Sequence, residues 1–241
     1  MTPTLRCNHR CLFCWRSFEH DAGEEEEIQP SVILNGLKAL QKKALSGYKV
    51  SPYVTPERFA EALEPRHVAI SLSGEPTLYN PLPALIDMFN AEGYTTFLVS
   101  NGTRPEVLRK CRPFQKYVSL VAPDKETYVR LCRPVEDSWE SVRESIGDLE
   151  QGRTAIRVTL VKGHNDCNPA GYGRIIGESG AKFVEVKGYM FLGYSRRRLE
   201  RSNMPEHDFI KQFAEEIGSS SGYRITGENP LSRVVCMERE G

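Results

Sequence analysis

Residues 67–77 read HVAISLSGEPT, an apolar run followed directly by a turn of small and acidic residues. The run at 67–72 has the composition of a buried strand. In parallel α/β proteins, ligands bind in turns of this kind at the carboxyl ends of strands. The segment therefore predicts a parallel α/β fold and a binding turn made of Ser73, Gly74, Glu75, Pro76 and Thr77.

The alternation of strands and helices continues along the chain. Further apolar strands are predicted at 94–99, 116–121, 155–161 and 183–186, with helical spacing of apolar residues between them. This pattern indicates parallel strands joined by right-handed crossovers, and 241 residues are enough for one such domain. A last helix is expected at 204–217 and a final strand at 232–237. Asn101, Ser119 and Asp124 fall near the binding edge, where each could hydrogen-bond a ligand or cap its helix.

Three charged residues lie on the predicted strands themselves. Arg157 interrupts an apolar strand, so its charge requires a partner such as a carboxylate. Alternation places Glu185 and Lys187 on the opposite face of their strand from Val184 and Val186. We expect Arg157, Glu185 and Lys187 to face the interior near the chemistry, with Lys187 either paired with Glu185 or acting as a nucleophile.

Near the amino end, residues 6–16 read RCNHRCLFCWR and place Cys7, Cys11 and Cys14 in the pattern C-x3-C-x2-C. Three thiolates on one short loop can hold three irons of a [4Fe–4S] cluster and leave the fourth iron open to a ligand. A structural zinc site completed by His9 or His20 is the alternative, since such sites have four protein ligands.

Composition narrows the class of protein. The 32 basic and 32 acidic residues balance, so any nucleic-acid contact must come from a local patch. Neither a signal-peptide pattern nor an apolar run of about 18 residues occurs, so we expect a cytoplasmic protein without a membrane segment. An odd total of seven cysteines fits a reducing compartment. The cysteines outside the loop, Cys111, Cys132, Cys167 and Cys236, are interpreted as small packed residues.

The segment 188–201 combines aromatic residues, glycines and a run of arginines. Aromatic rings stack on exposed bases and guanidinium groups bind phosphate, so the segment predicts an RNA contact, although a solvated loop has a similar composition. The candidate RNA-binding residues are Arg196, Arg197, Arg198 and Arg201.

The cysteine motif resembles the signature of the radical S-adenosylmethionine (SAM) superfamily. That resemblance implies an incomplete (β/α)6 barrel of parallel strands with outer helices, in which SAM chelates the open iron and is cleaved to a carbon radical. Residues 73–77 are similar to the GGEP-like motif of the superfamily, with Ser73 in place of the first glycine. Their backbone and Glu75 are then expected to hold the amino group of SAM, with Asn101 and Ser119 as further SAM contacts.

A longer match is more specific. The segments SLSGEPTLY, FLVSNGT, YVSLVAPDKETY and VEVKGYMFLGYSRRRL, the last followed by NMP, resemble the tRNA 4-demethylwyosine synthases. This resemblance covers nearly the whole chain. It implies that N1-methylguanosine at position 37 of tRNA(Phe) is condensed with a two-carbon unit of pyruvate, with an electron donor as partner, in wyosine and wybutosine biosynthesis. We expect one monomeric domain, residues 1–241, whose extension at about 188–241 contributes to RNA binding.

Two departures from that family carry expectations of their own. The family has a second iron–sulfur cluster on cysteines that precede the radical SAM motif, and six residues precede Cys7, so we expect an N-terminally incomplete copy. Val121 stands where the family usually has Asp. A radical SAM activase or small-molecule enzyme is the alternative function, and a zinc-bound RNA-binding module is the non-enzymatic one.

Overall fold

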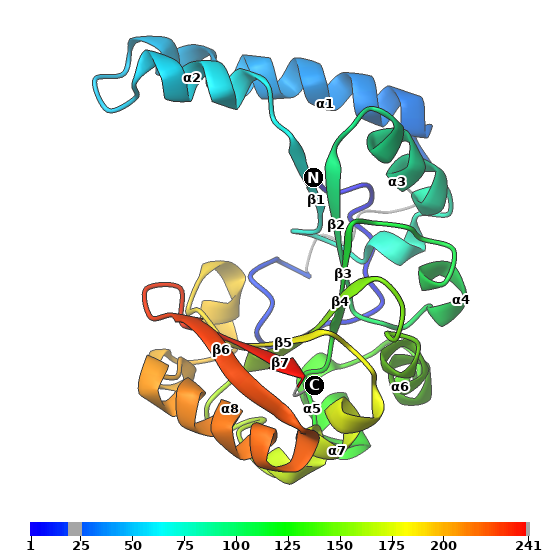
Figure 1. Cartoon of the computed structure of the whole chain (residues 1–241), viewed down its shortest axis with the longest axis vertical. Helices are drawn as coiled ribbons and strands as arrows, with labels where there is room; N and C mark the ends of the chain where they lie inside the picture. Colours follow the sequence, from blue (N-terminus) through cyan, green and yellow to red (C-terminus); the bar gives the residue numbers. More distant parts are fainter. Residues whose placement is uncertain (19–25, 240–241) are drawn as a thin grey trace.

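The computed structural model describes residues 1–18 and 26–239. Its described strands form one sheet in the order β1-β2-β3-β4-β5-β7-β6. The strands from β1 to β5 are parallel to their neighbours, whereas β7 runs antiparallel to both β5 and β6 (Figure 1). The bounds are β1 (His67–Ile70), β2 (Thr95–Ser100), β3 (Gln115–Ser119), β4 (Arg153–Leu160), β5 (Phe183–Gly188), β6 (Tyr223–Asn229) and β7 (Val234–Arg239).

Helices connect the strands and cover the outer face of the curved sheet (Figure 1). The connecting helices are α3 (Leu82–Ala91), α4 (Pro105–Leu108), α5 (Lys125–Cys132), α6 (Trp139–Gly147), α7 (Pro169–Glu178) and α8 (His207–Ser221). Before β1, α1 (Pro30–Leu45) and α2 (Pro56–Leu63) form an arm that extends away from the sheet. Short 3-10 helices are η1 (Ser46–Val50), η2 (Pro76–Leu78), η3 (Gly193–Arg197) and η4 (Arg201–Asn203). None of the described helices is long and apolar enough to cross a membrane.

The two faces of the sheet differ in polarity. On β4 and β5, Ile156, Val158, Val184 and Val186 are completely buried against the helices. The residues at 157, 159, 185 and 187 alternate with them and are only half-buried, because they face the concave side. Capping side chains mark the starts of helices. At the start of α5, the Asp124 carboxylate accepts a hydrogen bond of 2.8 Å from the Thr127 amide. The apolar face stabilises the fold and the concave face is available for chemistry.

The parallel α/β class predicted from the sequence is confirmed, and in the described part of the chain the parallel strands are the five from β1 to β5. Residues 1–6 form no strand, although the Ser71 amide donates to the Met1 carbonyl at 3.0 Å. The predicted final strand is β7, which pairs with β5 inside the sheet, and β6 was not predicted. Strand β6 lies at the edge of the sheet and most of its residues are exposed, so it lacks the apolar alternation that indicates a strand.

Candidate active site

The cysteine loop at residues 7–14 is held against the carboxyl end of α5 by backbone hydrogen bonds. The Arg10 amide donates to the Cys132 carbonyl at 2.9 Å, and the Leu12 amide donates to the Leu131 carbonyl at 2.9 Å. Within the loop, the Cys14 amide donates to the Cys11 carbonyl at 3.1 Å, which closes a tight turn between the two thiols. The short spacing of the motif therefore becomes a fixed loop.

The three thiols of this loop fit an iron–sulfur cluster by their chemistry. Burial raises the pKa of Cys7 to about 12, and the negative charges of Glu75, Cys11 and Cys14 add to the effect. The pKa of Cys14 is also raised, mainly by burial, although the positive charges of Arg198 and Arg16 oppose the shift. Thiols whose pKa is raised by burial and by nearby negative charges are stabilised as thiolates once a cationic metal joins them. Cys7, Cys11 and Cys14 are therefore a suitable donor set for the predicted cluster.

The predicted binding turn packs against residues 4–6, which lead into this loop. The Glu75 amide donates to the Arg6 carbonyl at 2.8 Å. Gly74 has φ +72°, and a Cβ there would lie 2.2 Å from the Thr4 carbonyl oxygen. Only glycine allows both this backbone conformation and this close approach. Leu72 also has a positive φ, of 87°, although it is not glycine, so the turn stores strain next to the loop.

The Glu75 carboxylate is hydrogen-bonded within the protein, and its predicted contact with SAM stays a prediction. Its Oε1 accepts hydrogen bonds from the Thr77 amide at 3.1 Å, the Thr77 hydroxyl at 2.7 Å and the Ser100 hydroxyl at 2.7 Å. Its Oε2 accepts from the Asn101 amide at 2.7 Å. The side chain is buried, and burial raises its pKa despite these donors. Glu75 thus holds the turn to the end of β2, which leaves the backbone of the turn for a ligand.

Some of the other predicted SAM contacts line a cavity beside the cysteine loop and some do not. Asn101 donates from Nδ2 to Asn8 Oδ1 at 2.9 Å, so its side chain joins β2 to the cysteine loop. Pro76 and Thr77 are buried in η2. A cavity of about 230 Å³ brings together Cys7, Cys11, Gly74, Glu75, Asn101 and Ser119, whereas Ser73, Pro76, Thr77 and Cys14 do not line it.

Arg157 and Glu185 form an ion pair across β4 and β5. Arg157 Nε lies 2.8 Å from Glu185 Oε1, and Arg157 Nη2 donates to Glu185 Oε2 at 3.3 Å. The guanidinium carbon lies 4.6 Å from the centre of the Tyr117 ring. The predicted carboxylate partner of Arg157 is confirmed. In the described part of the chain Glu185 pairs with Arg157 and not with Lys187, because Arg157 and Glu185 are register neighbours.

The arginine-rich segment contacts the cysteine loop. Arg198 donates from Nε to the Leu12 carbonyl at 3.1 Å, and from Nη2 to the carbonyls of Cys14 and of Arg16, the latter at 3.2 Å. Gly193 has φ +55°, and a Cβ there would lie 2.4 Å from the Trp15 carbonyl oxygen. Arg198 therefore braces the loop through these donors, and its predicted role in RNA binding stays a prediction.

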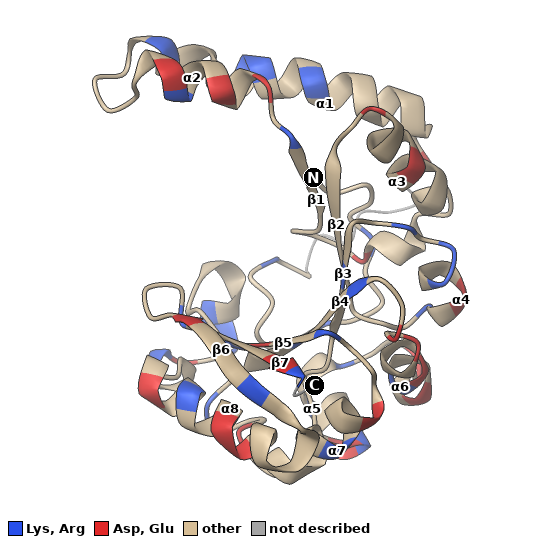
Figure 2. Cartoon of the chain, in the orientation of Figure 1, with Lys and Arg blue, Asp and Glu red and all other residues tan. Residues whose placement is uncertain are grey.

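The remaining predicted RNA-binding residues, Arg196, Arg197 and Arg201, are exposed. The guanidinium of Arg196 lies 5.6 Å from the Phe191 ring, and that of Arg197 lies 4.8 Å from the Tyr194 ring. Figure 2 shows basic residues on the segment between β5 and α8, and acidic and basic residues interleaved on the outer helices. Their role in RNA binding stays a prediction.

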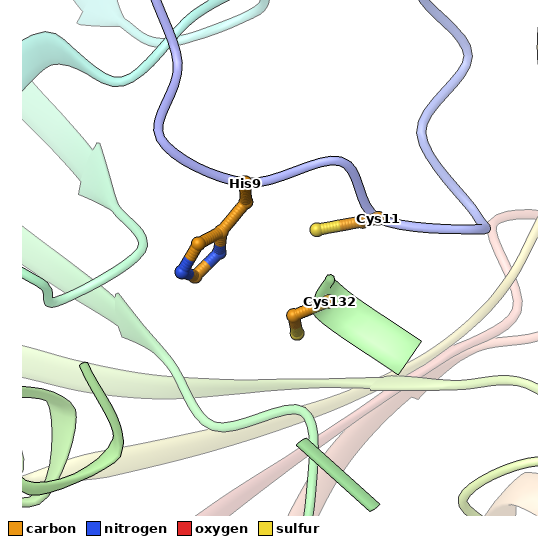
Figure 3. A group of neighbouring side chains, drawn as sticks. All are labelled: His9, Cys11 and Cys132. Atoms are coloured by element: carbon orange, nitrogen blue, oxygen red, sulfur yellow. The ribbon is translucent and has the colours of Figure 1, made fainter. Parts of the chain in front are cut away.

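One group of side chains was not predicted together. His9, Cys11 and Cys132 have potential metal-ligand atoms that all lie within 4.8 Å of one another (Figure 3). Cys132 is buried, as expected of a packed residue, yet its thiol meets a cysteine of the loop. Burial lowers the pKa of His9 to about 4. Of the two histidines in the zinc alternative, His9 belongs to this group and His20 lies outside the described residues. No sequence pattern links Cys132 to the loop.

Comparison with known proteins agrees with this geometry. Residues 1–170 match the model of the radical SAM superfamily, and residues 178–239 match a model described as wyosine base formation. The chain is 44% identical to the S-adenosyl-L-methionine-dependent tRNA 4-demethylwyosine synthase of Pyrococcus abyssi, covering 100% of this chain and 74% of that protein. The corresponding protein of Methanocaldococcus jannaschii is 39% identical, with 99% of this chain and 80% of that protein covered.

Solved structures give the same result. A structure of TYW1 with a lysine-pyruvate adduct bound matches with a TM-score of 0.91 and 38% identity, over 99% of this chain and 78% of that one. A crystal structure of archaeal TYW1 matches with a TM-score of 0.81 and 34% identity, over 99% of this chain and 77% of that one. The chain therefore belongs to the radical SAM family of tRNA 4-demethylwyosine synthases, enzymes of wyosine biosynthesis.

Proposed function

We propose that this enzyme condenses N1-methylguanosine at position 37 of tRNA(Phe) with a two-carbon unit of pyruvate. The observation that carries the proposal is the contact between the region matched to wyosine base formation and the cysteine loop. Arg198 and Gly193 lie against that loop, and the exposed Arg196 and Arg197 follow the same turn. A base held by this segment would therefore be delivered next to the cluster.

The cofactors proposed for this site are a [4Fe–4S] cluster and SAM. Cys7, Cys11 and Cys14 would hold the cluster, which supplies the electron that turns SAM into a source of a carbon radical. The backbone of the turn at Gly74, with Ser119 at the end of β3, would bind SAM in the cavity of about 230 Å³. Glu75 and Asn101 would position that turn rather than bind SAM through their side chains.

For pyruvate, we propose a covalent role for Lys187. Its amine would attack the keto carbon of pyruvate and release water, which gives a lysine adduct. The lysine-pyruvate adduct named for the matched TYW1 structure supports this type of chemistry. The neighbouring Arg157–Glu185 ion pair lies on the same face of the sheet and would help to position the substrate.

Borohydride trapping tests the lysine directly. Incubation of the protein with pyruvate and borohydride should add one pyruvate-derived group to the peptide that carries Lys187. Lys187→Arg should abolish that adduct, whereas Lys182→Arg, on the loop before the same strand, should keep it. An adduct mapped to a different lysine would overturn the assignment of Lys187 and leave the family unchanged.

The whole proposal is tested by anaerobic reconstitution. We expect iron and sulfide for one [4Fe–4S] cluster per chain, and SAM cleavage that rises when methylated tRNA and pyruvate are both present. Mass spectrometry of the digested tRNA should then detect 4-demethylwyosine. A rate of SAM cleavage that does not change when tRNA is added would favour a small-molecule enzyme. A protein that binds zinc without forming a reducible cluster would exclude radical chemistry.

RNA recognition has a separate test. The double variant Arg196→Ala/Arg197→Ala should weaken tRNA binding and reduce the slope of log affinity against log salt by roughly two, about one for each lost phosphate contact. The matched control is Arg109→Ala/Arg143→Ala, whose side chains pair with acidic residues on the outer helices. Equal salt slopes for the two variants would reject the segment as an RNA contact.

The same proposal covers the organisation of the protein. Residues 1–241 would act as one domain and one monomer, with residues from about 188 onward contributing to RNA binding. A tRNA substrate is consistent with a cytoplasmic location. An electron donor in that compartment would reduce the cluster. Gel filtration of the loaded enzyme at several concentrations would test the monomer, and a dimeric mass would reject it.

A further inference from the structure

His9, Cys11 and Cys132 form a compact donor group, of which the cluster uses only Cys11. Their potential ligand atoms all lie within 4.8 Å of one another, and Figure 3 shows two of them on the cysteine loop and the third at the end of α5. A tetrahedral zinc ion with Zn–S bonds of about 2.3 Å requires its two sulfurs to be about 3.8 Å apart. The thiols of Cys11 and Cys132 therefore need to move by about 1 Å or less.

The backbone around the group is already fixed. The amides of Arg10 and Leu12 donate to the carbonyls of Cys132 and Leu131, both at 2.9 Å, so the loop and the helix end are paired. His9 and Cys132 are 5% and 1% exposed. A metal ion that binds here orders little additional structure, because the segments that carry its ligands are joined without it.

Hydrogen bonding at one ring nitrogen leaves the other available in His9. The Tyr128 hydroxyl lies 2.7 Å from His9 Nε2 and 2.7 Å from the Ser138 hydroxyl. Because Nε2 is engaged by Tyr128, Nδ1 is the ring nitrogen left for a metal. With a metal at Nδ1, Nε2–H can donate to the Tyr128 oxygen, which is how metal-binding histidines are commonly held.

We propose that His9, Cys11 and Cys132 bind one Zn²⁺ in the chain before its cluster is assembled. Two thiolates and one imidazole form a donor set typical of zinc, and a water molecule completes the tetrahedron. Binding releases the protons of the two thiols to solvent, so zinc affinity rises with pH. Because Cys11 belongs to both groups, the zinc ion and the cluster exclude each other. Zinc would hold the chain in a form that cannot receive iron at Cys11.

The two metal sites can be separated by mutation, since Cys7 belongs only to the cluster and Cys132 only to the zinc site. Anaerobic apo-protein is titrated with Co²⁺, whose thiolate charge-transfer absorption reports the ligands, and then with Zn²⁺ in competition. We expect one Co²⁺ per chain in the wild type and in Cys7→Ala. Cys132→Ala should lose more than the roughly 10–100-fold in affinity that follows from loss of a hydrogen-bond partner behind a ligand.

Reconstitution with iron and sulfide should affect the two variants in the opposite order. Cys132→Ala should form the cluster with the iron content of the wild type, whereas Cys7→Ala should not. Preloading with Zn²⁺ should slow cluster formation in the wild type and leave Cys132→Ala unaffected. These outcomes concern metal content alone, so they do not depend on tRNA or on the proposed reaction.

Cys111→Ala is the matched control, because Cys111 is 2% exposed, as buried as Cys132, and lies outside the group. It should bind Co²⁺ as the wild type does. Cys132→Ser changes the volume of the side chain less than Cys132→Ala does and should lose Co²⁺ in the same way, which separates ligand loss from misfolding. Co²⁺ binding that survives in both Cys132 variants, or that disappears in Cys7→Ala, would overturn the proposal.

Discussion

Replacement of Arg198 by lysine tests whether this residue braces the cysteine loop. The guanidinium donates to the carbonyls of Leu12 and Cys14 in the loop and of Arg16 just after it, and lies 4.4 Å from the centre of the Phe18 ring. A lysine keeps the charge, but its compact ammonium cannot span the three acceptors. We expect it to keep one of these hydrogen bonds and to lose two.

The magnitude follows from the two lost hydrogen bonds. A hydrogen bond from a charged donor contributes about 1.5–3 kcal/mol. Arg198 is partly exposed, so water replaces much of this, and we expect the ordered loop to lose about 2 kcal/mol. At about 1.4 kcal/mol per factor of ten, the open form of the loop becomes roughly 30-fold more populated.

The assay is the anaerobic loss of iron from the reconstituted protein to a ferrous chelator. If the chelator reaches the cluster through the open loop, Arg198→Lys should lose iron roughly 30-fold faster than the wild type. Arg196→Lys is the matched control, because Arg196 is exposed and makes one hydrogen bond, of 3.2 Å to the Phe191 carbonyl. Affinity for tRNA should stay near that of the wild type in Arg198→Lys. Equal rates of iron loss in the two variants would refute the bracing role.

Three further substitutions test the site and the sheet. Gly74→Ala should destabilise the fold by about 3 kcal/mol, because it combines a positive φ with a clash against a carbonyl. In the control Gly36→Ala, nothing lies within 4 Å of the new Cβ, so the melting temperature should stay unchanged or rise. Glu75→Gln should cost about 1–3 kcal/mol, since an amide NH2 in place of Oε2 cannot accept the hydrogen bond from the buried Asn101 amide. Because the pKa of Glu75 is raised, the native state binds the proton of Glu75 more tightly than the unfolded chain does. The wild type should therefore gain stability as pH falls from 7 toward 5, and the difference in unfolding free energy between the wild type and Glu75→Gln in urea should widen. A difference that narrows would contradict the raised pKa. Arg157→Met leaves Glu185 unpaired and should cost roughly 2 kcal/mol, and adding Glu185→Leu should restore stability, so costs that simply add in calorimetry would argue against the pair.

The sequence predicts those parts of the protein whose signals are local. Alternation on β5 places Val184 and Val186 on the buried face and Glu185 on the other, as observed, because a strand has a period of two. The three cysteines of the loop are close in the chain, so their spacing alone suggests a metal. A glycine at position 74 is explained in full only by the carbonyls that approach it.

The features that sequence reasoning missed depend on contacts between distant segments. Arg198 is typical of an RNA-binding run by composition, and only the folded chain brings the carbonyls of the cysteine loop to it. Cys132 meets Cys11 through the pairing of α5 with the loop. Strand β6 has no apolar alternation because it lies at an edge, so its polar residues are those of a loop.

The sheet ends at β1 on one side and at β6 on the other, and these two strands are not paired with each other. A closed ring of strands admits only molecules small enough to pass through its mouth. An arc with two free sides can instead accept one nucleotide of a much larger polymer sideways, while the bulk of that polymer stays outside. The strands that this fold omits would thus set the size of what it can modify.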